Sequence, residues 1–120
     1  AHCHGNSGAY LERFADMGID GVEPLEPPPY GDNDLADAKR RVGRRMLLSG
    51  NIPSQAFHLS HFKIASLRDL VWRALDQGAP GGGFTLHTTG GAVGNGKTRE
   101  QCIRCIDCNR TIIDAWRAWH

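Results

Sequence analysis

The sequence predicts an α/β fold and, within that class, a partial (β/α)8 barrel of roughly four βα units. Short apolar segments bounded by Gly or Pro alternate with amphipathic helical segments, which is typical of βαβ units and a parallel sheet. A closed barrel of this kind needs about 250 residues, whereas the chain has 120. The chain also begins at a histidine-rich motif without Met, which suggests a piece of a longer protein. We therefore expect about half a barrel.

Four segments have the apolar spacing of amphipathic helices, and the first three of them end at glycines. They are about 7–17, 34–43, 66–78, and 98 to nearly the C-terminus. Ser66 is the predicted N-cap of the third segment. Thr98 and Gln101 form a predicted capping box at the start of the fourth.

The predicted strands are 21–25, 46–49 and 83–87, and residues 1–4 are interpreted as the end of a further strand. Loops at 26–31, 50–53 and 88–91 follow these strands. In α/β folds the chemistry lies at the C-terminal ends of the strands, so these loops are the first place to look for a site.

The nearly balanced charge of the chain argues against two classes of partner. The chain has 14 Lys+Arg against 13 Asp+Glu and a net charge of +1. Nucleic acids and anionic membranes need a basic face, so neither partner is expected. The basic run at 39–41 and 44–45 is interpreted as a solvated helix face. A small-molecule ligand is the expected partner.

His2 and His4 are spaced i, i+2, which on a strand places both imidazoles on one side, as two ligands of one metal ion require. Solvated terminal histidines are the alternative. An H-x-H motif at a strand end is also typical of amidohydrolase barrels, so a metal-dependent hydrolase remains a second hypothesis.

Glu23 and Glu26 flank the end of the next strand. Glu26 could act as a ligand or general base, or be a solvated loop carboxylate.

Cys102, Cys105 and Cys108 are spaced like part of an iron–sulfur motif. At the helical period they share an arc with Ile106 and Trp116, so we interpret them as packing residues. Unpaired cysteines are typical of a reducing compartment, which predicts a cytoplasmic protein.

Residues 91–98 match the P-loop pattern G-x-x-x-x-G-K-[ST] between a strand and a helix. A P-loop would hold phosphates through backbone N–H groups and Lys97, with Thr98 on magnesium. A nucleotidase of this class also needs a later strand that ends in a carboxylate, and none follows. Phosphate binding is therefore kept as an alternative only.

Four stretches in order resemble the C-terminal half of the uroporphyrinogen decarboxylase superfamily. They are HCHGN at 2–6, GIDGVEPLE at 18–26, LADAKRRVG at 35–43 and LSGN at 48–51. The resemblance covers nearly the whole chain and implies a (β/α)8 barrel. Members of that superfamily include cofactor-independent decarboxylases of tetrapyrroles and zinc-dependent methyltransferases that use cobalamin.

The resemblance is nearer to the methyltransferase branch, which implies zinc as cofactor and a corrinoid as co-substrate for methyl transfer to a thiol. His2 matches the first zinc ligand, His4 the second in place of a cysteine, and His87 substitutes for the third. Glu26 and Asn51 are the expected catalytic residues. The decarboxylase branch would need no cofactor and would take a tetrapyrrole such as uroporphyrinogen.

The same resemblance implies that the residues holding a porphyrinogen belong to the N-terminal half of the barrel, outside this chain. We therefore expect the chain alone to be inactive. Half a barrel also leaves two unpaired sheet edges, so a homodimer is a possible state.

Overall fold

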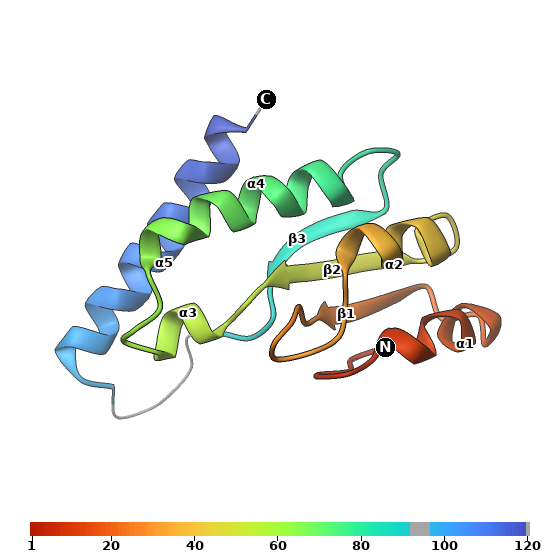
Figure 1. The fold of residues 1–120 in the computed structure, drawn as a ribbon, viewed down its shortest axis with the longest axis horizontal. Helices are drawn as coiled ribbons and strands as arrows, with labels where there is room; N and C mark the ends of the chain where they lie inside the picture. The colour runs from red at the N-terminus through yellow and green to blue at the C-terminus, as the bar shows by residue number, and fades with distance from the viewer. Residues whose placement is uncertain (92–96, 120) are drawn as a thin grey trace.

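The computed structural model describes residues 1–91 and 97–119, and it confirms the α/β class. Three strands form one parallel sheet in the order β1-β2-β3, which is also their order along the chain (Figure 1). The strands are β1 (Gly21–Leu25), β2 (Leu47–Ile52) and β3 (Phe84–Thr88). The helices are α1 (Leu11–Asp16), α2 (Leu35–Val42), α3 (Gln55–His58), α4 (Leu67–Gly78) and α5 (Arg99–Ala118), and the 3-10 turns are η1 (Gly8–Tyr10) and η2 (Ile64–Ser66).

The central strand β2 sets the register of the sheet. Its Leu48 lies opposite Val22 on one side and Phe84 on the other. Leu48 is completely buried and Val22 nearly so, and both belong to the single hydrophobic core. Burial of one leucine side chain contributes about 1.5–3 kcal/mol, so this row anchors the sheet.

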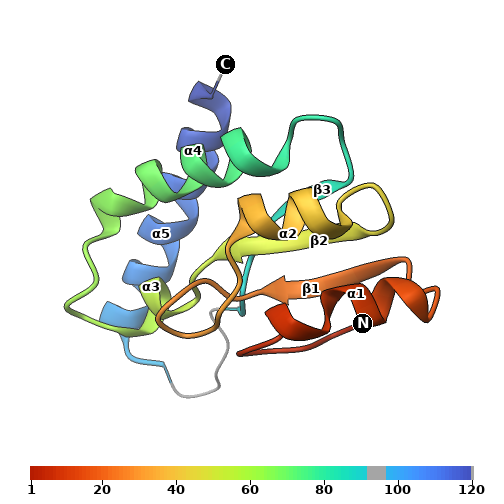
Figure 2. The same ribbon diagram turned by 45° about the vertical axis from the view of Figure 1, so that its right-hand side comes forward.

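Helices α2 and α4 cover one face of the sheet (Figures 1 and 2). Helix α1 packs on α2, α2 on α4 and α4 on α5, so neighbours in the chain are neighbours in space. Helix α2 connects β1 to β2 and α4 connects β2 to β3, and a right-handed crossover between adjacent parallel strands places both on the same face. The opposite face of the sheet is left for polar side chains.

Residues 1–4 pair with β1 as the predicted strand end implies, but over a single bridge and not as a full strand. His2 makes a single parallel bridge with Glu23, in which the Glu23 N–H donates to the Ala1 carbonyl at 2.9 Å and the Cys3 N–H donates to the Glu23 carbonyl at 2.7 Å. The N-terminal segment therefore lies beside β1 as a short extension of the sheet, in parallel orientation.

Several sequence-based assignments differ from the structure. Strand β2 extends to Ile52, so residues 50–52 belong to a strand and not to the predicted loop. The short helix α3 was not predicted. Ser66 precedes α4 but makes no side-chain cap; its hydroxyl donates to the Lys63 carbonyl at 2.6 Å within η2. The capping box of Thr98 and Gln101 is confirmed.

The interpretation of the cysteine arc on α5 is only partly correct. Cys108 is completely buried, and its thiol donates to the Ala56 carbonyl at 3.4 Å. Burial raises the pKa of this thiol. Cys102 is exposed, and so are Ile106 and Trp116, which were expected in the core. The helix contacts α3 and α4 along a narrower strip than the helical period predicted.

The basic run on α2 is more than a solvated face. Arg41, with 28% of its side chain exposed, forms ion pairs with Glu12 of α1 and with Asp37. A guanidinium nitrogen of Arg41 also donates to the Gly8 carbonyl at 2.8 Å. The interaction lowers the pKa of Glu12 to about 2. Arg41 therefore fastens α1 to α2.

A substitution at Gly78, the last residue of α4, tests how closely that helix packs on β3. A Cβ atom at this position would lie 2.5 Å from Cγ of Phe84. Gly78→Ala would gain about 1 kcal/mol in helix propensity, but overpacking costs about 1–3 kcal/mol. We expect the free energy of unfolding in urea to fall by about 1 kcal/mol. The neighbouring change Gln77→Ala should leave it within about 0.5 kcal/mol of the parent.

The pair of Glu12 and Arg41 predicts a specific acid sensitivity. A carboxyl whose pKa is lowered by folding stabilises the folded state above its unfolded pKa, and this contribution is lost as the pH falls toward the folded value. The difference in Tm between the parent and Glu12→Gln should therefore be full at pH 6, shrink below about pH 4.5 and vanish near pH 2. The exposed carboxylate Asp114 provides a control, because Asp114→Asn should give no such difference. A pH-independent Tm difference for Glu12→Gln would contradict this role of the ion pair.

Candidate functional site

The candidate site lies on the face of the sheet that α2 and α4 leave uncovered. Side chains alternate along the strands, so the neighbours of the buried Val22 and Leu48 point away from the core. Glu23, Thr85 and His87 are exposed on this face. Together they border a recess of about 500 Å³, whose walls also include Ala1, His2, Gly21, Val22, Leu47 and Ser49.

His2 and Glu23 form the first imidazole–carboxylate pair of the site. Nδ1 of His2 lies 3.1 Å from Oε1 of Glu23, and the backbone bridge between these two residues holds them together. The hydrogen bond to His2 lowers the pKa of Glu23, and the nearby His87 lowers it further. The carboxylate therefore stays ionised and orients the imidazole.

His4 and Glu26 form a second pair, closer to the end of β1. Nδ1 of His4 lies 3.5 Å from Oε2 of Glu26. Glu26 is only 7% exposed, and the backbone N–H of Gly5 donates to Oε2 at 2.6 Å. Glu26 is thus a buried carboxylate, and it was predicted as either a functional group or a solvated loop residue. Its position ties the N-terminal segment to the loop that follows β1.

The two histidines are close neighbours, as their spacing predicted. Their ring centroids are 4.8 Å apart in an edge-to-face arrangement. In both rings Nδ1 faces a carboxylate, so Nε2 is the nitrogen left to meet a ligand or to transfer a proton. Carboxylates placed behind histidines in this way fix the ring orientation at many metal and proton-transfer sites.

The other two predicted site residues, His87 and Asn51, border different cavities although they are register partners. His87 and Asn51 are paired across β2 and β3. His87 borders the recess that also contains His2 and Glu23. The side chain of Asn51 lines a different cavity on the helix-covered side, and its Nδ2 donates to the Leu25 carbonyl at 3.1 Å. The structure therefore groups His87 with the histidine site and separates Asn51 from it.

The donor set meets the requirements of a zinc site only in part. Imidazole and carboxylate are suitable zinc ligands, and a catalytic zinc needs three of them. Within residues 1–91 and 97–119, no three His, Cys, Asp or Glu side chains are close enough together to hold a metal ion. His2 and His4 supply two adjacent imidazoles, and His87 does not complete the set in its present position.

The P-loop pattern lies largely outside the described residues, which omit 92–96. Its last two residues, Lys97 and Thr98, are described. Thr98 caps α5, and its hydroxyl accepts a hydrogen bond from the Gln101 N–H at 3.2 Å. Nζ of Lys97 lies 3.4 Å from the sulfur of Cys105. Both contacts belong to the start of α5.

Sequence analysis missed two groups that the structure adds to the site. Ser49 and Thr85 are register partners and border the recess between Glu23 and His87. The period-2 alternation of β3, in which Thr85 and His87 alternate with the less exposed Phe84 and Leu86, could have identified this face. Nothing in the sequence points to Ser49.

The comparisons with known proteins give no family. No protein-family model matches the chain, and a search of the curated proteins finds no match. Fold and site together define an α/β protein with a parallel sheet whose open face carries two imidazole–carboxylate pairs. None of the helices in the described part of the chain is long and apolar enough to cross a membrane.

The pairing of His2 with Glu23 can be tested by titration. In His2→Ala the hydrogen bond that lowers the pKa of Glu23 is lost, so this pKa should rise toward the ordinary glutamate value of about 4.3. Carboxyl-carbon NMR of the glutamate-labelled chain measures the change. His61→Ala, which removes an exposed histidine elsewhere, should leave the Glu23 titration unchanged. An unchanged Glu23 pKa in His2→Ala would show that the pair does not form in solution.

Proposed function

We propose that the chain is one half of a (β/α)8 barrel enzyme similar to the uroporphyrinogen decarboxylase superfamily. The observation that supports this proposal is the strand order, which is the chain order with every strand parallel. A barrel repeats this arrangement around its ring, and each half of a doubly wound sheet contains it too. The resemblance of residues 2–51 is what favours the barrel. Helix α1 packs on α2, α2 on α4 and α4 on α5, a succession that is compatible with the outer ring of a barrel.

In this proposal the open face of the sheet becomes the inner wall of the barrel. Barrel enzymes place their reacting groups at the C-terminal end of that wall. Glu26 directly follows the C-terminal end of β1 and pairs with His4. His2 and Glu23 border the recess beside the middle of β1, with His87 on β3 also in its wall. A carboxylated tetrapyrrole is the substrate class that the resemblance implies, and imidazolium groups would attract its carboxylates.

The reaction that these side chains support best is decarboxylation by proton transfer. The bond between a substrate carbon and its carboxylate breaks, CO2 leaves, and the electron pair remains on the carbon. An imidazolium on this face, His2 with Glu23 behind it, donates its Nε2 proton to that carbon. The neutral imidazole then recovers a proton from solvent.

Zinc-dependent methyl transfer from a corrinoid to a thiol is the second candidate. The observation that favours it is the pair of neighbouring imidazoles, each with a carboxylate at Nδ1 and with Nε2 outward. Bound zinc would lower the pKa of the acceptor thiol. The described residues offer two adjacent ligands and not the three that such a site needs. For either reaction, the four free cysteines support a reducing compartment such as the cytoplasm.

Binding of a carboxylated porphyrin tests the first candidate. The residues that the resemblance assigns to holding a porphyrinogen lie outside this chain, but the imidazoles of the open face should still bind the carboxylates of uroporphyrin measurably. Loss of a charge-assisted hydrogen bond in His2→Ala should weaken binding by roughly tenfold. Porphyrin fluorescence provides the measurement. His58→Ala, at an exposed histidine on α3, is the matched control and should bind like the parent.

A zinc titration of the same chain separates the two candidates. The decarboxylase proposal predicts no stoichiometric zinc after dialysis. One equivalent of zinc that is lost in the double variant His2→Ala/His4→Ala, and kept in His58→Ala/His61→Ala, would overturn it in favour of methyl transfer. A chain that binds neither porphyrin nor zinc would contradict both candidates.

A further inference from the structure

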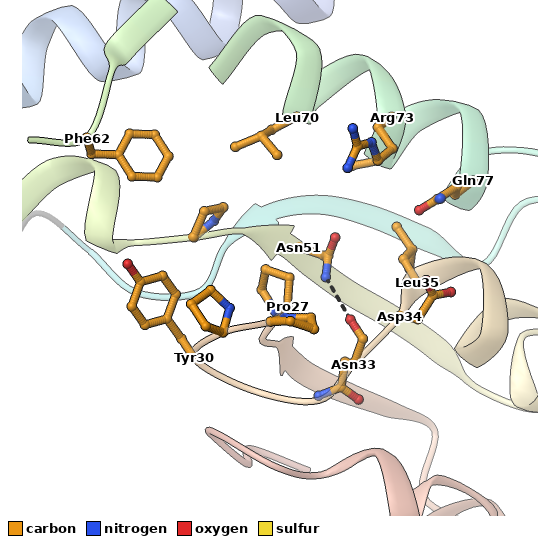
Figure 3. Close-up of a pocket in the computed structure, with 14 residues that line it drawn as sticks. Pro27, Tyr30, Asn33, Asp34, Leu35, Asn51, Phe62, Leu70, Arg73 and Gln77 are labelled. Carbon is orange, nitrogen blue, oxygen red and sulfur yellow. Dashed lines mark hydrogen bonds between the residues drawn. The ribbon is translucent and has the colours of Figure 1, made fainter. Parts of the chain in front are cut away.

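A second cavity lies on the opposite, helix-covered side of the sheet, between α4 and the loop after β1 (Figure 3). Its volume is about 670 Å³, which is in the range of small-molecule sites. None of its lining residues borders the recess of His2 and His87. The cavity is therefore separate from the recess in its lining, although its loop wall begins directly after Glu26, the partner of His4.

The cavity has an apolar end and a polar end. The rings of Tyr30 and Phe62 lie at one end (Figure 3), and the prolines of residues 27–29 also line the cavity. Arg73 and Gln77 of α4 lie at the other end. Aromatic rings and prolines provide flat apolar walls, whereas a guanidinium provides a planar set of donors that fits a carboxylate.

Arg73 is the group that indicates the charge of the ligand. Figure 3 shows its side chain directed from α4 toward the cavity. Among the described residues, ion pairs are made by Arg40, Arg41 and Arg45, and no carboxylate lies within ion-pair distance of Arg73. Its charge is therefore available to an anion from solution.

Asp34 limits how much negative charge the cavity can accept. This residue also lines the polar end, and its carboxylate caps α2 by accepting from the Asp37 N–H at 2.7 Å. A dianion such as phosphate would meet a fixed negative charge beside a single arginine. A monoanion adds the least negative charge beside Asp34 while it pairs with Arg73, and an apolar body fills the apolar end.

We propose that this cavity binds a small aromatic monocarboxylate, with the carboxylate on Arg73 and the ring between Tyr30 and Phe62. The proposal goes beyond the decarboxylase-like function, because it assigns a second ligand to a separate part of the molecule. Asn51 lines the same cavity but donates to the Leu25 carbonyl, so its contribution is to shape the wall.

Phenylacetate is the probe, and two-dimensional ¹H–¹⁵N NMR of the full chain is the measurement. We expect saturable shifts at Tyr30, Leu70, Arg73 and Gln77, and no shifts at His2 or Glu23. Arg73→Gln should weaken binding by roughly tenfold or more, because a charge-assisted hydrogen bond is lost. Phenethylamine has the same ring with the opposite charge and should not bind there.

Arg68→Gln is the matched control, because Arg68 lies on the same helix and stacks over Trp72, away from the cavity. It should bind phenylacetate like the parent. Tyr30→Ala, at a loop position, should weaken binding several-fold through loss of the apolar wall. The proposal is overturned if phenylacetate gives no saturable shifts, if the shifts lie outside the cavity, or if folded Arg73→Gln binds as tightly as the parent.

Discussion

The parallel pairing of β1, β2 and β3 is the constraint on which the other features of the structure depend. Parallel neighbours need a crossover between them, and its fixed hand places every connecting helix on the same face. The apolar residues of the strands, with Leu48 at their centre, must then face these helices. Polar residues are consequently collected on the opposite face, where an ionisable group keeps its contact with water.

Strand β2 also divides the two candidate ligand sites from each other. Ser49 faces the recess of the histidines, and Asn51, two residues further, lines the cavity under α4. The strand is held on both sides by backbone hydrogen bonds and by the core. It therefore separates the two sites, which have different walls and different charged groups.

Much of this fold could be predicted because it follows from local patterns. The α2 boundaries, the capping box of Thr98 and the strand at Gly21–Leu25 are encoded in a few adjacent residues. The proximity of His2 and His4 follows from period-2 geometry in the same way. Interactions between distant segments were not predicted. The burial of Glu26 depends on Gly5, and the ion pair of Arg41 depends on Glu12, which no local pattern in either segment encodes.

The loop after β1 connects this strand to α2, and through a tight contact at Gly31 it also holds the N-terminal segment in place. A Cβ atom at Gly31 would lie 2.5 Å from the Glu26 carbonyl oxygen and 2.7 Å from the Gly5 carbonyl oxygen, so the loop closes directly on the N-terminal segment. Asn33 adds a bond from Nδ2 to the Ser7 hydroxyl at 3.0 Å. A change of loop length would therefore alter the spacing of the histidines before it altered the sheet. Divergent versions of this chain could retune the site by insertions here while keeping the scaffold intact.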